Sequence, residues 1–383
     1  MPSKTQYPAL SYALIGCGRV SIKHLKAVLK KNSGLSMTAI VDSNPDAPVK
    51  LLRSAGLSDS SVQKLLTYVR IYTDFEEMLV KEKPQVVAIT VPSGLHFRIA
   101  KTCLLAGAHI LLEKPMTMRS SQARELYDLS ISTGKKIAMG HIYRYFPIVG
   151  NLRKDIADGV FGSISHGSVI VRWGHDQAYY DQAAWRGTWK SDGGALMNQT
   201  VHALDLLCWL MNGTALSASA MIARRFHEME AEDVALGMLT LDNGALCHVE
   251  GTTNTSAHDH EAAFFINGTK GTLRVGLRKG KPFFDIRDEK GHRKNFYYLR
   301  KDLKEKGLLG LLSLLNPHAG IYKDLIEAIH EDRNPIADAQ SGYTSVDMVL
   351  GLYQSAKEGR QITLPLTADF SSEEMSGYFP ASN

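Results

Sequence analysis

Three polar residues interrupt an apolar pattern of helical spacing in the segment "GGALMNQTVHALDLL", residues 193–207. On a helix that turns about 100° per residue, Asn198, His202 and Asp205 fall together within an arc of roughly 60°, opposite the leucines. A histidine titrates near neutral pH and suits general base catalysis, and an asparagine positions groups through hydrogen bonds. The pattern leaves two interpretations open, a solvated helix face or one wall of an active site.

A second group of residues is typical of a dinucleotide site. The apolar run "SYALIG" leads into "GCGRVSIKHLKAVLK", so that Gly16 and Gly18 lie between a predicted strand and a predicted helix. Glycines there allow a tight turn and bring the backbone close to a pyrophosphate at the helix N-terminus. Asp42 ends the next predicted strand, where a carboxylate binds the adenosine ribose hydroxyls and disfavours a 2′-phosphate. These residues predict NAD in preference to NADP; the alternative for Asp42 is a capping role at the strand end.

A lysine follows a later strand of the same region, in the motif "EKP" at 113–115. Ligands of open parallel sheets bind outside the carboxyl ends of the strands. Lys114 is therefore expected at the edge from which it reaches a nicotinamide or a substrate hydroxyl. A surface lysine before a proline that enters a helix is the alternative, and the sequence pattern favours neither.

These residues need a scaffold, and the apolar runs predict one. Short apolar strands alternate with helical segments over roughly residues 9–145, as expected for a parallel sheet of βαβ units. Hairpins with Asn-Gly turns follow, at 234–253 and 261–275. We therefore predict an α/β fold: an N-terminal Rossmann dinucleotide-binding domain, residues 1–145, and a C-terminal α+β domain with an open, mostly antiparallel sheet, residues 146–383. The second domain is expected to bind substrate and to form the oligomer contact. Packing of the C-terminal helices on the Rossmann domain is left open.

Composition excludes several classes of protein. The 383 residues carry a net charge of +5, with 44% hydrophobic and 22% charged residues, as in ordinary globular proteins. No basic run or aromatic-basic stripe indicates nucleic-acid binding, and no segment reaches the length of a membrane span. The cysteines have no paired spacing and no zinc motif is present, so no metal is expected. Unpaired thiols and the lack of a hydrophobic signal core predict a cytoplasmic protein.

Two features predict contacts with other chains. An open antiparallel sheet leaves one face needing cover, so we expect a homodimer or homotetramer formed through the C-terminal sheet. The segment "LRKDLKEKGLLGLLSLL" at 299–315 is basic and amphipathic. A surface helix, or a loop packed against a partner, explains it better than membrane contact.

The combination of these motifs resembles the Gfo/Idh/MocA oxidoreductase family. The similarity runs from "ALIGCGRVSIKHLKA" through "TVPSGLH", "LLEKPM" and "WRGTW…GGALMNQTVHALDLLCWL" to "PHAGIYKDLIEAI" and "SAKEGRQITLPL", nearly the whole chain. It implies an N-terminal Rossmann domain, a C-terminal open sheet through which subunits associate, and NAD(P)-dependent oxidation of a sugar hydroxyl. Within the family, "YYDQAAWRGTW" and "GGALMNQTVH" look most like the UDP-N-acetylglucosaminuronate 3-dehydrogenases of surface-polysaccharide biosynthesis.

The resemblance also implies roles for individual residues. Lys114 corresponds to the catalytic lysine of the family and His202 to its catalytic histidine, whereas Asn198 stands where many members have aspartate. The implied cofactor-binding residues are Gly16, Gly18, Arg19, Val20, Asp42, Thr90, Pro92, His96, Glu113, Lys114, Trp185 and Arg186. The implied substrate-binding residues are Asn198, Gln199, Arg144 and Tyr145.

We therefore predict an NAD-dependent dehydrogenase that oxidises a sugar ring hydroxyl, at C3 for preference, on a UDP-linked N-acetylhexosaminuronate or a related sugar. His202 takes the hydroxyl proton in this scheme while Lys114 holds the reacting oxygen, and Asp205 orients His202 or caps backbone groups. Three alternatives stay open: a 3-dehydrogenase of free sugars, glycosides or inositols; a glycoside hydrolase that keeps NAD tightly bound; and a non-catalytic sensor of NAD or sugar.

Overall fold

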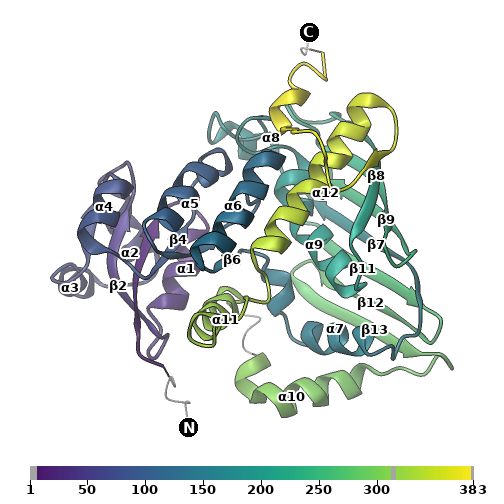
Figure 1. Ribbon diagram of the computed structural model, residues 1–383, viewed down its shortest axis with the longest axis horizontal. Helices are drawn as coiled ribbons and strands as arrows, with labels where there is room; N and C mark the ends of the chain where they lie inside the picture. The colour runs from purple at the N-terminus through teal and green to yellow at the C-terminus, as the bar shows by residue number, and fades with distance from the viewer. Residues whose placement is uncertain (1–6, 312–315, 381–383) are drawn as a thin grey trace. The chain divides into compact units, whose positions relative to one another are not determined.

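The computed structural model describes residues 7–311 and 316–380, which divide into two compact units (Figure 1). The first unit takes residues 1–116, 122–142 and 313–342, and the second takes 117–121, 143–312 and 343–383. The chain thus crosses between the units several times, where the sequence pattern suggested a single boundary after residue 145. One crossing exists because helix α11 (His318–His330) packs against α1 (Ser21–Val28) within the first unit.

A six-stranded parallel sheet forms the centre of the first unit, with strand order β3-β2-β1-β4-β5-β6. Its strands are β1 (Leu10–Ile15), β2 (Leu35–Val41), β3 (Arg70–Tyr72), β4 (Val86–Ile89), β5 (His109–Leu112) and β6 (Ile137–Met139). All of β4 is buried, as expected for an apolar strand with both faces covered. The predicted Rossmann-type architecture is confirmed. The strand order reverses between β1 and β4, and sheets of this kind bind ligands outside the strand ends at that reversal.

Short helices connect the strands of this sheet. Besides α1 they are α2 (Ala47–Ser54), α3 (Asp59–Leu65), α4 (Phe75–Glu82), α5 (His96–Leu105) and α6 (Ser120–Thr133). Side-chain capping sets where some of them begin. Asp74 accepts the backbone N–H groups of Glu76 and Glu77, which is the geometry of an N-cap at the start of α4.

An eight-stranded sheet forms the second unit, in the order β13-β12-β11-β7-β10-β9-β8-β14. Its strands are β7 (Ile164–Trp173), β8 (Ala215–Ala223), β9 (Val234–Leu241), β10 (Leu246–Thr252), β11 (His260–Gly268), β12 (Gly271–Arg278), β13 (Lys281–Asp288) and β14 (Ile362–Thr363). The predicted hairpins are β9–β10 and β11–β12. The sheet is mostly antiparallel as predicted, except that β10 runs parallel to β7, because β7 is inserted between the two hairpins.

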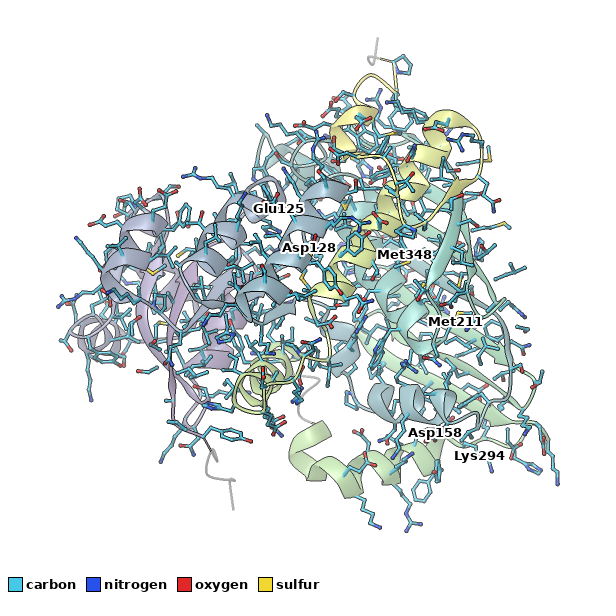
Figure 2. The ribbon with its side chains drawn as sticks, viewed as in Figure 1. Glu125, Asp128, Asp158, Met211, Lys294 and Met348 are labelled. Atoms are coloured by element: carbon cyan, nitrogen blue, oxygen red, sulfur yellow. The ribbon has the colours of Figure 1, made fainter. Side chains whose placement is uncertain are left out.

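Helices cover one face of the second sheet. They include α7 (Val149–Ala157), α9 (Val201–Leu210) and most of α12 (Ala339–Glu358); a short helix, α8 (Gln177–Asp181), follows β7. Sulfur atoms pair in the core beneath them: Cys208 Sγ lies 3.5 Å from Met348 Sδ, and Cys247 Sγ lies 3.5 Å from Met211 Sδ (Figure 2). All four cysteines of the chain are thiols without a disulfide.

The other face of this sheet carries apolar side chains that are more than half exposed. They are Met221 on β8, Leu236 and Met238 on β9, and Leu246 on β10. The cross-strand register places Met221 beside Leu236. Alternation along a strand sends these residues to the face opposite the helices.

The basic segment predicted at 299–315 forms most of helix α10 (Asn295–Leu311), and residues 312–315 lie outside the described part of the chain. Asp155 of α7 accepts a hydrogen bond from Tyr298 at 2.9 Å and forms an ion pair with Lys301 at 2.7 Å. These contacts fix α10 on α7 within the second unit. Among the described residues, no helix is long and apolar enough to cross a membrane.

Candidate active site

The glycine turn of the first unit connects β1 to α1. Gly16 donates its N–H to Val41 of β2 at 2.8 Å and has a φ of +93°. A Cβ on Gly16 would lie 2.8 Å from the backbone carbonyl of Thr90, so both conformation and space require glycine. Gly18 and Arg19 are exposed, which places the start of α1 at the surface, where its N–H groups suit an anion.

Asp42 fastens the glycine turn to the end of β2. Its Oδ2 accepts the N–H of Cys17 at 2.8 Å, and its Oδ1 accepts the N–H of Asn44 at 2.9 Å. A carboxylate has about four acceptor positions, so these two bonds leave capacity for ribose hydroxyls. Val20 occupies the N-cap position of α1 on the same turn. The tight turn, the helix start and the carboxylate fit a dinucleotide whose ribose is not phosphorylated.

Thr90 and Pro92 belong to the neighbouring strand end. Thr90 is buried, and its hydroxyl donates to the carbonyl of Gly16 at 2.7 Å, which ties the end of β4 to the glycine turn. Pro92 precedes the short turn Ser93–Leu95 that leads into α5. The structure thus brings these two residues and the glycine turn to one edge of the sheet.

Two residues expected to bind the cofactor make side-chain contacts within the protein. His96 is buried, with Nδ1 2.7 Å from the carbonyl oxygen of Pro115 and Nε2 3.0 Å from that of Val91. Burial lowers the pKa of His96. Glu113 is also buried, with Oε1 2.8 Å from Nε2 of His24. These polar atoms hold neighbouring segments in place, and the cofactor-binding role of both residues stays a prediction.

Lys114 follows Glu113 at the carboxyl end of β5 and is half-buried. Its backbone N–H donates to Oε2 of Glu113 at 3.3 Å. Because the strands are parallel, Lys114 lies at the same edge of the sheet as Gly16 and Asp42. This is the edge that the sequence predicted for it; its catalytic role stays a prediction.

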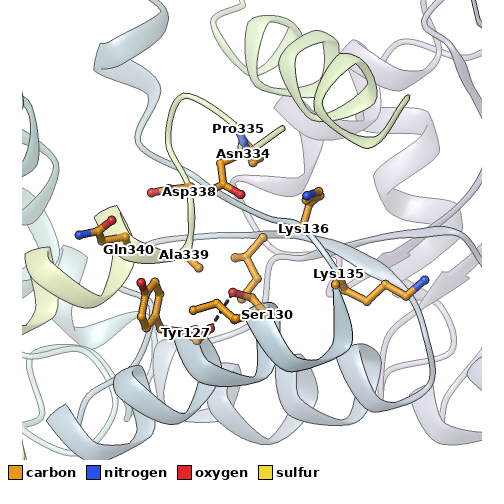
Figure 3. Close-up of a pocket in the computed structure, with 12 residues that line it drawn as sticks. Tyr127, Ser130, Lys135, Lys136, Asn334, Pro335, Asp338, Ala339 and Gln340 are labelled. Atoms are coloured by element: carbon orange, nitrogen blue, oxygen red, sulfur yellow. Dashed lines mark hydrogen bonds between the residues drawn. The ribbon is translucent and has the colours of Figure 1, made fainter. Parts of the chain in front are cut away.

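A pocket of about 270 Å³ lies at the opposite edge of this sheet (Figure 3). It is bounded by the end of α6, the start of β6 and the segment 334–340. Tyr127, Lys135 and Asp338 are among its lining residues. Because the amino ends of the strands meet there, this pocket is not the dinucleotide crevice.

In the second unit, residues 193–207 are not one regular α-helix. Residues Ala195–Thr200 form a π-helix, and α9 begins at Val201. The Thr200 hydroxyl donates to the carbonyl of Ala195 at 2.8 Å across this wider turn. The wheel at 100° per residue is therefore wrong before residue 201, so Asn198 and His202 are not a simple i, i+4 pair. Such π-helical turns occur frequently at functional sites.

A buried carboxyl group holds the start of the π-helix, and sequence reasoning missed it. Oε1 of Glu232 accepts the N–H of Leu196 at 2.8 Å and the hydroxyl of Tyr353 at 2.9 Å. Burial raises the pKa of Glu232 to about 8. Gly193 has a φ of +68°, and a Cβ on Gly194 would lie 2.1 Å from the Glu232 carbonyl oxygen. Gly194 is required because the chain passes directly against Glu232, and Gly193 because of its positive φ and because a Cβ there would lie 2.5 Å from Cβ of Met197.

Asn198 contacts a second carboxylate that the sequence did not reveal. Its Nδ2 donates to Oδ1 of Asp192 at 2.6 Å, and Oδ2 of Asp192 accepts the N–H of Gly187 at 2.9 Å. Asp192 is 4% exposed and Asn198 is half-buried. A carboxylate is therefore present beside position 198 even though the residue there is an amide.

Gln199 joins an aromatic cluster that contains the expected cofactor residues Trp185 and Arg186. Its Nε2 lies 3.1 Å from Nε2 of His175, whose ring stacks on Tyr179 at 3.7 Å between centroids. The Arg186 guanidinium lies 4.2 Å from the Tyr179 ring and 4.7 Å from the Trp185 ring. The structure thus brings Gln199, Trp185 and Arg186 together through His175 and Tyr179, which sequence reasoning did not single out.

His202 lies at the first turn of α9 and is half-buried, with its ring 5.6 Å from that of Tyr143. Tyr145 ends the short turn Ile142–Tyr145 and is half-buried as well.

Arg144 on this turn is buried and forms a two-pronged ion pair with Asp205, at 2.8 and 2.6 Å. This ion pair supplies a buried partner for each of the two charges. The substrate-binding role of Arg144 and the positioning role of Asp205 toward His202 stay predictions.

The fold and the glycine turn define an NAD-binding oxidoreductase, and comparisons with known proteins agree. One family model, described as an oxidoreductase family with an NAD-binding Rossmann fold, matches residues 10–141. A second, described as the GFO/IDH/MocA C-terminal domain, matches residues 149–274. The chain belongs to the Gfo/Idh/MocA oxidoreductase family, whose members are NAD-dependent sugar and polyol dehydrogenases.

Three similar proteins illustrate the family. The WlbA dehydrogenase of Bordetella pertussis, solved with NADH and UDP-GlcNAcA, is 29% identical, with a TM-score of 0.81 over 94% of this chain and 99% of that one. The WlbA dehydrogenase of Chromobacterium violaceum, solved with the same molecules, is 28% identical, with a TM-score of 0.79 over 96% and 99%. D-glucoside 3-dehydrogenase of Escherichia coli is 23% identical over 95% of this chain and 100% of its own.

Proposed function

We propose that this enzyme oxidises the C3 hydroxyl of a UDP-linked N-acetylhexosaminuronate, or of a closely related sugar, to a ketone with NAD. The observation that carries the proposal is the similarity over nearly the full length to two dehydrogenases whose structures hold NADH and UDP-GlcNAcA. The local Asn198-Gln199 pair, where many members of the family have aspartate first, supports the same subgroup.

NAD, when bound, accepts the hydride that leaves the sugar carbon. The glycine turn, the start of α1 and Asp42 would hold the dinucleotide at the carboxyl ends of the strands of the first sheet. The chain's own residues then handle the proton. The His202 imidazole takes it from the hydroxyl, and the ammonium of Lys114 donates a hydrogen bond to the oxygen as the carbonyl forms. Loss of a hydride and a proton together gives the ketone.

Asn198 has a positioning role in this scheme. An amide does not accept a proton at neutral pH, so it acts through hydrogen bonds. Its Nδ2 is already committed to Asp192 at 2.6 Å.

A substrate panel tests the proposal. Purified protein is mixed with NAD and, in separate reactions, UDP-linked N-acetylhexosaminuronates, other UDP-sugars, free glycosides and inositols. NADH absorbance and mass spectrometry of the sugar follow the reaction. Because tightly held NADH hides turnover, each reaction is repeated with 2-oxoglutarate as a recycling oxidant. A 3-keto product from the UDP-uronate at the highest kcat/KM supports the proposal.

Other outcomes separate the alternatives. If the enzyme prefers a free glycoside, the proposed reaction stands but the proposed substrate is wrong. The similarity to D-glucoside 3-dehydrogenase supports this alternative. Release of free sugar without net NADH would indicate a hydrolase. Binding of sugar or NAD without any turnover across the panel would indicate a sensor and contradict the proposal.

The exposed sheet face supports a proposal about assembly, with a second copy of this chain as its occupant. On this face Met221 is the cross-strand neighbour of Leu236, Met238 follows two residues further along β9, and Leu246 lies on β10 opposite Thr240. Beside it, Arg172 pairs with Glu250 at 2.6 Å, which provides both signs of charge for a self-complementary contact. Light scattering at micromolar concentration is expected to give a dimer or tetramer. A monomer would contradict this, and Met238→Lys is the variant that should dissociate the assembly.

A further inference from the structure

Three buried titratable side chains meet in the first unit, next to the strand end that carries Lys114. His24 comes from α1, Glu113 follows β5, and His318 is the first residue of α11. One polar atom from each lies within 4.8 Å of the others, and all three residues are at least nine-tenths buried. The cofactor and substrate scheme above uses none of these side chains, so the cluster needs its own explanation.

The carboxylate of Glu113 is the centre of the cluster. Its Oε1 lies 2.8 Å from Nε2 of His24 and 3.5 Å from Nε2 of His318. Its Oε2 accepts the backbone N–H of Lys114 at 3.3 Å. A Cβ on Gly140 would lie 2.8 Å from Oε2, so the glycine makes the room that the carboxylate occupies. One carboxylate thus serves donors from two helices and from the Lys114 backbone.

The direction of the hydrogen bonds follows from protonation. Burial raises the pKa of Glu113, but the hydrogen bonds from His24 and His318 outweigh it and hold that pKa well below its ordinary value. Burial lowers the pKa of His24, so its imidazole is neutral and carries one N–H. With that N–H on Nε2 and directed at Glu113, Nδ1 must accept.

Two tyrosines supply the donor that Nδ1 needs. The hydroxyl of Tyr322 lies 2.9 Å from Nδ1 of His24, and the hydroxyl of Tyr12 lies 2.9 Å from that of Tyr322. Tyr12 therefore donates to Tyr322, Tyr322 to His24, and His24 to Glu113. This ordered relay fixes the tautomer and the ring orientation of His24.

We propose that this relay is a positioning device for Lys114, which deepens and rests on the proposed function. The relay fixes Glu113, and Glu113 fixes the backbone of Lys114 to α1, the helix that begins at the glycine turn. His96 holds the other side, through the carbonyl of Pro115. With the backbone held on both sides, the lysine side chain starts from a fixed point, so less of its motion must be lost when it contacts the reacting oxygen.

Two histidines and a glutamate also have the chemistry of a zinc site. The hydrogen-bond interpretation is favoured because it accounts for the 2.8 Å contact and for the tyrosine partners of His24. Elemental analysis of the enzyme, purified without chelators, distinguishes the two. The relay predicts far less than one zinc per chain. One zinc per chain that is lost in His24→Gln would overturn the proposal.

Glu113→Gln is the central test. The amide has the same shape but only one acceptor oxygen, so either the histidines or the Lys114 N–H must face an NH₂ group. We expect kcat to fall about 10- to 100-fold, as for a buried donor left without its acceptor, while the Kd for NAD by calorimetry changes less than about twofold. The rate at which an amine-reactive reagent labels Lys114, read by peptide mass spectrometry, should also change, which a merely structural role would not produce.

Two further variants keep the test informative if Glu113→Gln folds poorly. Tyr322→Phe removes only the hydroxyl that faces His24 and should lower kcat about three- to tenfold. His109→Gln is the matched control: His109 begins β5 at its other end, where Nδ1 accepts the N–H of Lys136 at 2.9 Å. It should leave both kcat and Lys114 labelling within about twofold of the wild type.

The outcomes separate this proposal from the proposed function. If Lys114→Met abolishes turnover but Glu113→Gln and Tyr322→Phe leave kcat and labelling unchanged, the relay is only structural and the positioning role is overturned. If Lys114→Met retains turnover, the proposed catalytic role of Lys114 fails. The labelling rate in Glu113→Gln and Tyr322→Phe then still decides whether the relay controls the position of that side chain.

Discussion

The two units hold their candidate site residues in different ways. In the first unit, Gly16, Asp42 and Lys114 each follow a strand of one parallel sheet, and the sheet itself brings them to one edge. In the second unit, Asn198 and His202 lie on one helical segment whose first turn is shaped by Glu232. Strand-end sites are set by topology, whereas a site on a distorted helix depends on buried partners that lie far away in the sequence.

The largest expected effect compares one residue from each unit. Lys114→Met and His202→Ala should each lower kcat at least about 100-fold, because in the proposed mechanism each removes a group that contacts the reacting oxygen or its proton. NAD should still bind, since the glycine turn and Asp42 are intact. Steady-state kinetics together with calorimetry of NAD binding check this. Near-normal turnover in either variant would show that the residue is not part of the mechanism. Only the candidate catalytic residue of the other unit would then remain.

Moving the carboxylate between positions 192 and 198 tests whether a buried partner positions residue 198 in the second unit. Asn198→Asp places two carboxylates at the 2.6 Å contact that Asn198 now makes with Asp192, and kcat/KM should fall about 10- to 30-fold. Combining it with Asp192→Asn restores one carboxylate and one amide. The double variant should therefore recover most of the loss, which a double-mutant cycle measures. Additive losses would show that the contact does not position residue 198.

The matching test in the first unit changes Asp42. Asp42→Ala removes the acceptor of the Cys17 and Asn44 N–H groups and the charge that opposes a 2′-phosphate. The Kd for NAD should rise about tenfold, and the preference over NADP should shrink. The control is Asp46→Ala, an exposed acid at the start of α2 whose side chain makes no capping bond there. Equal effects of both variants would argue against a ribose-binding role for Asp42.

The smallest effect concerns stability and pH. Because burial raises the pKa of Glu232 to about 8, the folded enzyme binds a proton that the unfolded chain releases near pH 4.5. The contribution of Glu232 to stability, and with it the melting temperature, should therefore fall as pH rises from about 5 to about 8. Glu232→Gln keeps an acceptor for Leu196 and Tyr353 without the ionisation, so this decline should flatten. Melting curves between pH 5 and 9 decide; an unchanged slope would assign the pH dependence to other groups.

The same contrast explains what the sequence could and could not predict. Gly16, Asp42 and Lys114 were placed correctly because a strand end is marked locally, by an apolar run and the residue that follows it. The hairpins of the second sheet were marked in the same way by Asn-Gly pairs, which lie in the turn between β9 and β10 and at the end of β11, just before the turn Thr269–Lys270. The relay at Glu113 was not predictable, because His318 comes from a helix far along the chain.

The helical wheel failed for a physical reason. It assumes a fixed turn per residue, but Ala195–Thr200 form a wider π-helical turn, and Glu232 binds the N–H of Leu196 there. The local sequence does not indicate this contact. The ion pair of Arg144 could not be predicted either, because its partner, Asp205, is 61 positions away.

The wide turn at Ala195–Thr200 has a consequence for how such a site diversifies. A π-turn closes with one residue more than an α-turn. Deleting a single residue from this segment would restore α-helical spacing and rotate the residues before the deletion by about 100° relative to α9. Gln199 and its neighbours would then point in new directions while His202 stayed where it is. In this part of the chain, a one-residue deletion would therefore reorient Gln199 relative to His202 without any substitution.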